Sequence, residues 1–272
     1  MAAALRCAAV LALLCAPVAA HAGNVRQVAL RHIGSDANEL RFVRPLEFEH
    51  RLRVCNAFPY NAAMDVYRGK EKLTDKPMAY KDCRDFTAPL KSGDRLDFRV
   101  GDASAGTFSV ADLPNNNAVL LLVVHRHDTL STVVSFESHV FADLQNAQVA
   151  VIDTYKGSEQ AKPQILDRPV PGKGQRKEEL RYDSVVAVSP GVYEVELSGK
   201  DGVTKARKEL VAMNHTSYVV LRTGVEAGQG PAFPEELVVF PHIDPSAVQG
   251  AAATQSTWLM LVVGFTVLAV QP

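Results

Sequence analysis

The sequence of 272 residues has almost no net charge, four cysteines and a single tryptophan. Because the formal charge is −1 and no long basic stripe occurs, nothing indicates a nucleic-acid partner. The sequence also lacks a glycine-rich phosphate loop and a Cys-x-x-Cys zinc or redox pair. We therefore expect no cofactor. Hydrophobic residues make up 47% of the chain, which indicates a globular protein with room for two domains.

The four cysteines divide into two pairs. Cys7 and Cys15 lie in an apolar N-terminal stretch that has the form of a secretory signal peptide, expected at residues 1–22. Cys55 and Cys83 remain after its removal. In an oxidising compartment two thiols in one module are expected to form a disulfide with each other. The alternative is two buried free thiols.

The C-terminal end carries a second apolar stretch, Trp258–Val270, of 13 residues. A membrane-spanning helix needs roughly 20. A short apolar tail behind small residues fits a GPI attachment signal, for which we favour Ser246 as the attachment residue. The alternative is a tail anchor that also uses residues 251–255. Either reading predicts membrane attachment and an extracellular or cell-surface location, which is periplasmic if the organism is bacterial.

The strand prediction centres on residues 117–127, NAVLLLVVHRH, an aliphatic run between turn residues. Such a run is typical of a strand buried on both faces. A second run, 217–222, follows the turn at 214–216. Gly93 and Gly191 are 98 residues apart, as are Asn116 and Asn214, which favours a duplication.

The fold class is therefore predicted as all-β: two tandem immunoglobulin-like β-sandwich modules, with an N-terminal signal peptide and a C-terminal hydrophobic tail. The modules are expected at 51–143 and 147–242, after an N-terminal segment at 23–50 with a short strand at 25–30. Residues 243–272 are expected to be a linker and anchor signal. Alternating residues predict strands at 52–56, 64–67, 80–90, 96–100, 106–110, 117–127 and 133–141, then at 147–152, 184–188, 192–197, 217–222 and 236–240.

Candidate catalytic and metal-binding residues are few. His125 and His127 stand two apart on a predicted strand, so both imidazoles would point the same way and could hold a metal. No third ligand has a diagnostic spacing, and we favour a solvated surface pair. Ser104 lies in Gly101–Gly106, expected to be a loop between strands, where no nucleophile elbow is formed. No catalytic residue is assigned.

Two other features bear on surface chemistry. Asn214 begins the sequon Asn-His-Thr in a predicted turn, which suits N-glycosylation. Residues 168–179 are rich in Pro, Gly, Lys and Arg and are expected to form a mobile exposed loop. Its cations are candidates for binding acidic glycans: Arg168, Lys173, Arg176 and Lys177.

The order of short motifs resembles known families. It runs through Leu-Arg-Val-Cys-Asn-Ala at 52–57, Met-Asp-Val-Tyr at 64–67, Phe-Arg-Val-Gly at 98–101 and the aliphatic strand at 119–124. This order is similar to an extracellular β-sandwich module of surface proteins of unassigned function. With a second β module behind it, residues 41–242 also resemble the AlgF family, periplasmic accessory proteins of alginate O-acetylation. The resemblance implies an adaptor that hands acetyl or polymer between acetyltransferase components, without a catalytic triad of its own.

Three functions remain open. The first is a non-catalytic accessory role in polysaccharide O-acetylation or matrix glycan binding, with acidic polysaccharide or an acetyltransferase-complex protein as partner. The second is a structural or adhesive surface module that binds a protein. The third is a serine-dependent acetyl ester enzyme that uses Ser104.

Overall fold

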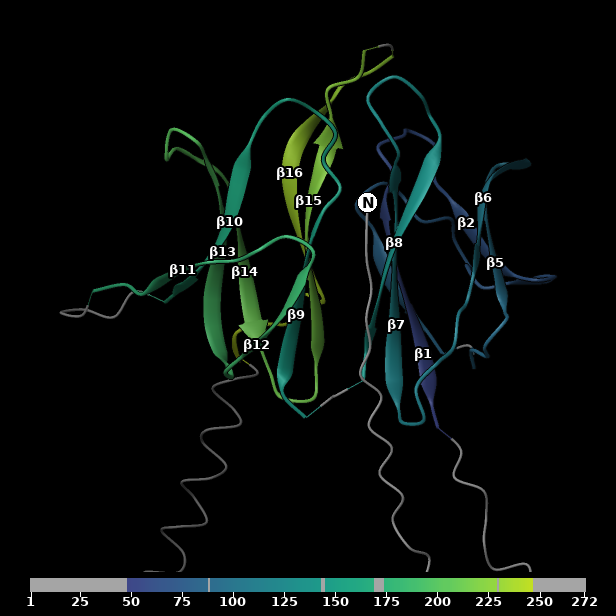
Figure 1. Ribbon diagram of the computed structural model, residues 1–272, viewed down its shortest axis with the longest axis horizontal. Coiled ribbons are helices and arrows are strands. Elements are labelled where there is room, and N and C mark those ends of the chain that lie inside the picture. The colour runs from purple at the N-terminus through teal and green to yellow at the C-terminus, as the bar shows by residue number, and fades with distance from the viewer. Residues whose placement is uncertain (1–47, 88, 143–144, 169–173, 229, 247–272) are drawn as a thin grey trace, which may run out of the picture. The chain divides into compact units, whose positions relative to one another are not determined.

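The computed structural model describes residues 48–87, 89–142, 145–168, 174–228 and 230–246, which belong to one compact unit, Glu47–Pro272. The expected signal peptide, the strand at 25–30 and the apolar tail lie outside the described residues. The described chain is all-β, as the sequence predicts, with four sheets of four strands (Figure 1). No helix within this part is long and apolar enough to cross a membrane.

The N-terminal half forms two sheets. One has the order β4-β1-β7-β8 and the other the order β3-β2-β5-β6. The strands are β1 His50–Ala57, β2 Asp65–Arg68, β3 Glu71–Lys72, β4 Cys83–Phe86, β5 Arg95–Val100, β6 Ala103–Ser109, β7 Ala118–Arg126 and β8 Val134–Phe141.

The C-terminal half repeats this arrangement with β12-β9-β15-β16 and β11-β10-β13-β14. The strands are β9 Ala147–Asp153, β10 Ala161–Asp167, β11 Lys177–Glu179, β12 Ser184–Val188, β13 Gly191–Gly199, β14 Thr204–Ala212, β15 Ser217–Val225 and β16 Phe233–Phe240.

The two halves share their connectivity strand for strand. In each, the first strand pairs in parallel with the seventh: β1 with β7, and β9 with β15. In each, the fourth strand pairs with the first on its other side, and the seventh with the eighth. This common order of eight strands is what a duplication predicts, and it adds a topological argument to the spacing of 98 residues between matching turns.

Three apolar layers hold the four sheets together. The first lies between the two N-terminal sheets and contains Leu52 and Phe98, and the third lies between the two C-terminal sheets and contains Val149 and Tyr218. The middle layer joins the halves, because it combines Cys55, Val119, Leu121, Val123 and Phe141 of one half with Ala150, Ile152, Val219 and Leu221 of the other.

The middle layer explains the two apolar runs in the sequence. Sheets β4-β1-β7-β8 and β12-β9-β15-β16 are covered on both faces, so their central strands β7 and β15 are buried along their whole length. The sequences of such strands are continuous hydrophobic runs, because the side chains on both faces of the sheet are shielded from water. The prediction of doubly buried strands is confirmed for Ala118–Arg126 and for 217–222, whereas Asn117 and His127 lie outside β7 and are exposed.

Polar contacts also cross between the halves. The buried Arg53 of β1 binds Asp85 through two nitrogens, at 2.6 and 2.8 Å, and donates to the carbonyl of Ser217 at 2.5 Å. Its guanidinium lies 5.0 Å from the ring centroid of Phe240. Thr223 donates to the carbonyl of Ala57. Asp85, Ser217 and Phe240 are the partners of the buried Arg53, which therefore connects β1 to β15 and β16.

The expected disulfide between Cys55 and Cys83 is present. The two cysteines lie directly opposite each other on the antiparallel strands β1 and β4, with a Cα–Cα distance of 4.1 Å. The bond closes a loop with a sequence separation of 28 residues.

Some expected boundaries are wrong. Ser104, expected in a loop, lies on β6 opposite Arg99. Residues 177–179, expected within a mobile loop, form β11 and pair with β10. Strand β10 was missed because Pro163 argues against a strand. Strand β14 was missed because its Lys-Ala-Arg-Lys-Glu segment at 205–209 has no alternating apolar residues.

Candidate functional site

A groove of about 640 Å³ lies on the C-terminal half. It collects side chains from five separate parts of the chain. These are the end of β9, the start of β10, the segment between β11 and β12, the turn after β13, and β15. The lining residues are Asp153, Gln160, Ala161, Lys162, Pro163, Glu179, Leu180, Arg181, Tyr182, Gly199, Lys200 and Arg222.

Arg222 forms the buried base of this groove, with a relative exposure of 5%. Its Nη1 donates to Asp153 at 2.9 Å and its Nε donates to Glu235 at 2.6 Å. Its Nη2 donates to the carbonyl of Glu159 at 2.5 Å. The guanidinium also stacks on Tyr155, 4.3 Å from the ring centroid. Each of the three guanidinium nitrogens therefore donates a hydrogen bond, and together with the stacking these bonds hold Arg222 in place.

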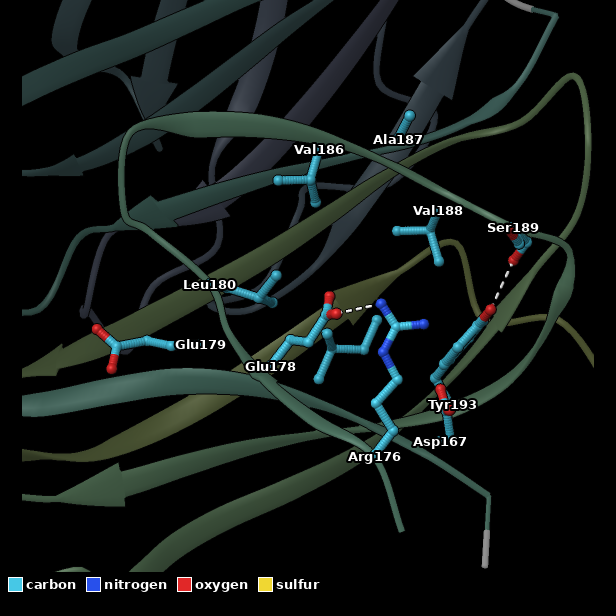
Figure 2. A pocket seen from close by; sticks show the side chains of 11 residues that line it. Asp167, Arg176, Glu178, Glu179, Leu180, Val186, Ala187, Val188, Ser189 and Tyr193 are labelled. Atoms are coloured by element: carbon cyan, nitrogen blue, oxygen red, sulfur yellow. Dashed lines mark hydrogen bonds and ion pairs between the residues drawn. The ribbon is translucent and has the colours of Figure 1, made fainter. Parts of the chain in front are cut away.

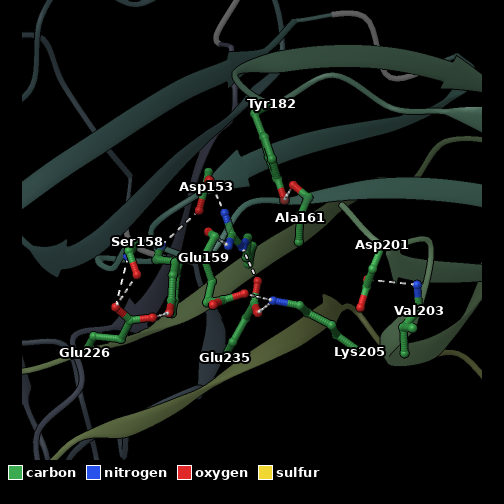
Figure 3. A network of polar contacts seen from close by, with 12 residues as sticks. Asp153, Ser158, Glu159, Ala161, Tyr182, Asp201, Val203, Lys205, Glu226 and Glu235 are labelled. Carbon is green, nitrogen blue, oxygen red and sulfur yellow. Dashed lines mark hydrogen bonds and ion pairs between the residues drawn. The ribbon is translucent and has the colours of Figure 1, made fainter. Parts of the chain in front are cut away.

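Lys205 extends this network to the surface (Figure 3). Its ammonium group lies 2.9 Å from Glu159 and 2.8 Å from Glu235. The hydrogen bonds to Glu235 and Glu159 raise the pKa of Lys205. Burial raises the pKa of Asp153, while the positive charge of Arg222 acts in the opposite direction. The cluster therefore places two cations among three carboxylates.

A second part of the network fixes the loop that leads into β10. Glu226 accepts hydrogen bonds from the hydroxyl of Tyr155 at 2.5 Å and from the backbone and hydroxyl of Ser158 at 2.9 and 3.0 Å (Figure 3). These bonds, that of Tyr155 first, lower the pKa of Glu226 to about 2. Because the carboxylate remains ionised at neutral pH, it holds the loop at 155–160 beside the groove.

The rim of the groove is cationic. Lys162 is paired with Glu179 at 3.0 Å. Arg181 and Lys200 have no ion-pair partner among the residues that the structure describes. Tyr182 donates its hydroxyl to the carbonyl of Ala161 at 3.0 Å, so its ring has a fixed orientation at the wall. The rim thus offers two unpaired positive charges next to an oriented aromatic ring.

Arg176, one of the predicted glycan-binding cations, lines a different hollow, of about 210 Å³ (Figure 2). There Arg176 forms an ion pair with Glu178, and Asp167 and Glu179 also line the wall. Lys177 lies 3.4 Å from the buried Glu196. Of the other candidates, Arg168 is exposed, and Lys173 lies outside the described residues. The hollow therefore has more carboxylates than cations, which disfavours an acidic ligand there.

The two candidate metal ligands have different surroundings. His125 is 3% exposed, and its Nε2 lies 3.8 Å from a carboxylate oxygen of Glu137 without a hydrogen-bond partner. Burial lowers the pKa of His125. His127 follows the end of β7 and contacts Asp128 at 3.0 Å. No group of three or more potential metal ligands occurs within the described part of the chain.

The remaining candidates are exposed. The side chain of Ser104 has no hydrogen bond to an imidazole or carboxylate among the described contacts. Asn214 is exposed in the turn between β14 and β15. Ser246 is exposed at the end of the described chain, where its backbone N–H donates to Asp244 at 2.8 Å.

Sequence reasoning missed the groove and its base. One local signal was present: Arg222 is a charged residue at the end of a run that is otherwise apolar, and a buried charge requires partners. No pattern in the sequence identifies those partners, since Asp153 and Glu235 are distant in the chain. Comparison with known proteins finds no matching protein-family model and no similar curated protein.

Proposed function

We propose that this protein is a non-catalytic binding protein for acidic polysaccharide, and that the groove above Arg222 is its binding site. The observation that supports this most is the pair of unpaired cations, Arg181 and Lys200, beside the oriented ring of Tyr182. Ligand sites commonly combine an apolar or aromatic surface with a few placed polar groups. The groove has both.

Each rim residue has a role in this proposal. The guanidinium of Arg181 is a planar fork that suits a uronate carboxylate. The ammonium of Lys200 provides a second charge for another acidic residue of the polymer. The ring of Tyr182 provides an apolar surface for a sugar ring. Arg222 is neutralised by Asp153 and Glu235, so its role is to keep the base of the groove in place.

The cellular setting belongs to the same proposal. We infer a surface-attached protein, exported by residues 1–22 and held through a lipid at Ser246 or through a tail anchor. The resemblance to AlgF supports an accessory role in glycan O-acetylation, with acidic polymer or an acetyltransferase component as partner. The immunoglobulin-like assignment of the two sandwiches is also a proposal, supported by their all-β composition and four-stranded sheets.

The test is binding of the full chain to a polyuronate, measured by isothermal titration at low and high salt. We expect salt-sensitive binding that is at least about tenfold weaker in the Arg181→Gln, Lys200→Gln variant, since one charged hydrogen bond contributes about 1.5–3 kcal/mol. The control is Lys70→Gln, Lys91→Gln, which removes the same charge from exposed positions of the N-terminal half.

Two results would overturn the assignment of the groove as a site for acidic polysaccharide. One is equal binding to a neutral polysaccharide. The other is an equal loss of affinity in both pairs of variants, which would show that only the total charge matters. Hydrolysis of an acetyl ester that is abolished by Ser104→Ala would contradict the non-catalytic assignment.

A further inference from the structure

The eight edge strands of the four sheets are not equally protected against pairing with another chain. An exposed edge presents unpaired N–H and C=O groups, and proteins often block it with charge, proline or a bulge, which a glycine often marks. Seven of the eight edges have such features: Arg84 and Asp85 in β4, Glu137 in β8, Glu71 and Lys72 in β3, Gly106 and a register shift at β6, three charges in β11, several in β14, and Pro234 with Glu235 in β16.

Strand β12 lacks all of these features. Its sequence, Ser-Val-Val-Ala-Val at 184–188, contains no charge, glycine or proline. Its register with β9 runs without a shift. Val185 is 37% exposed and Ala187 is also exposed. No strand of the described chain pairs with the outer edge of β12.

We propose that β12 is an association surface that pairs with β12 of a second copy of this chain, antiparallel and across a two-fold axis. Such an isologous contact would extend β16-β15-β9-β12 into one continuous sheet of both copies. The inference is independent of the acidic-polysaccharide proposal.

The composition of the strand argues for a second copy as the partner. Because β12 has no charged residue, no register of two antiparallel β12 strands places like charges opposite each other. Its valines would pair with β-branched or small residues of the other copy, which are favourable cross-strand neighbours. A foreign peptide selected by charge would find no complementary group on this strand.

The test is the mass of the full chain in solution, measured by sedimentation over a range of concentrations. We expect a mass of two copies for the wild type at high concentration. The variant Val185→Lys, Ala187→Lys should dissociate with a constant at least about tenfold higher, because like charges would then face each other across the axis. The control is Val133→Lys, Val203→Lys, which adds the same two charges at exposed valines in the connections between β7 and β8 and between β13 and β14.

A mass of one copy at every concentration would overturn the proposal. So would association that is unchanged in the double variant, since it would then occur through another surface. A second measurement covers the case in which the variant does not fold. Hydrogen exchange at residues 184–188 of the wild type should slow as the protein concentration increases, and exchange that is independent of concentration would also overturn the proposal.

Discussion

Replacing Arg222 with methionine should destabilise the protein far more than replacing an exposed arginine. Methionine keeps much of the length and apolar contact of the side chain but removes the charge. Asp153 and Glu235 would then lose the guanidinium that binds them at 2.9 and 2.6 Å. The stacking of Arg222 on Tyr155 would also be lost.

The size of this effect follows from burial. Removing one partner of a buried ion pair costs about 3–5 kcal/mol, because the other charge remains without compensation. Lys205 still neutralises Glu235, so the lower part of this range, about 3 kcal/mol, is expected for Arg222→Met. The matched control is Arg207→Met. Arg207 also contacts two carboxylates, Glu194 and the buried Glu196, but its own side chain is 55% exposed. Without Arg207, Glu196 keeps the bonds from Lys177, Ser198 and Thr204, so the expected loss is that of an exposed pair, about 0–1 kcal/mol.

The free energy of unfolding that Arg222→Met loses should depend on pH in a defined direction. Without Arg222, the pKa of Asp153 should rise further above its unfolded value, because the charge and the hydrogen bond of Arg222 no longer oppose burial, and only the backbone N–H of Tyr155 and the charge of Lys156 still do. A carboxyl with a raised pKa binds more protons when folded, so the free energy of unfolding falls as pH rises through that pKa. The deficit of Arg222→Met should therefore be largest at neutral pH and smaller near pH 4.

Urea denaturation followed by circular dichroism measures these free energies. The double variant Arg222→Met, Asp153→Asn should recover part of the lost stability, since it removes the uncompensated charge. The reasoning is refuted if Arg222→Met costs no more than Arg207→Met, or if its deficit grows on acidification.

Three further predictions concern other parts of the chain. Replacing both Cys55 and Cys83 with alanine should lower the free energy of unfolding by about 3–4 kcal/mol, estimated from the 28-residue separation, and mature wild-type protein should show no thiol that can be alkylated without reductant. Burial lowers the pKa of His125, so its folded form binds fewer protons than the unfolded chain. Stability should therefore fall as pH decreases below about 6.5, and a His125→Gln variant should show a shallower decrease in denaturation experiments across this range. Expression in a eukaryotic secretory pathway should give a protein whose mobility shifts on glycosidase treatment, and Asn214→Gln should abolish that shift.

The sequence predicted the parts of the fold that have a local physical cause. The runs at 117–127 and 217–222 are apolar because both faces of β7 and β15 are covered, and that cause is visible in the residues themselves. The disulfide was predictable because only two cysteines remain after the expected signal peptide.

The parts that were missed depend on tertiary context. Strand β14 has one face in water, and four of its nine residues are charged types that also suit a helix, so its pairing with β13 decides its conformation. The packing of the two central sheets against each other has no sequence pattern of its own. Each half alone would leave Leu121 or Val219 on an exposed face, and only their contact in the middle layer explains why both are apolar.

The groove could not be predicted for the same reason. Its walls come from residues near 153, 160–163, 179–182, 199–200 and 222, and no local spacing connects them. The sequence located the cations of this half in the segment 168–177, whereas the structure places carboxylates around Arg176 and leaves Arg181 and Lys200 unpaired within the described chain.

Hydrogen exchange of the full chain with and without a polyuronate tests the central claim most directly. Binding in the groove should slow exchange at residues 160–163, 179–182 and 199–200 and leave the outer N-terminal sheet, at 65–72 and 95–109, unchanged. Slower exchange confined to that outer sheet, or no change at saturating polymer, would contradict the assignment of the groove as the binding site.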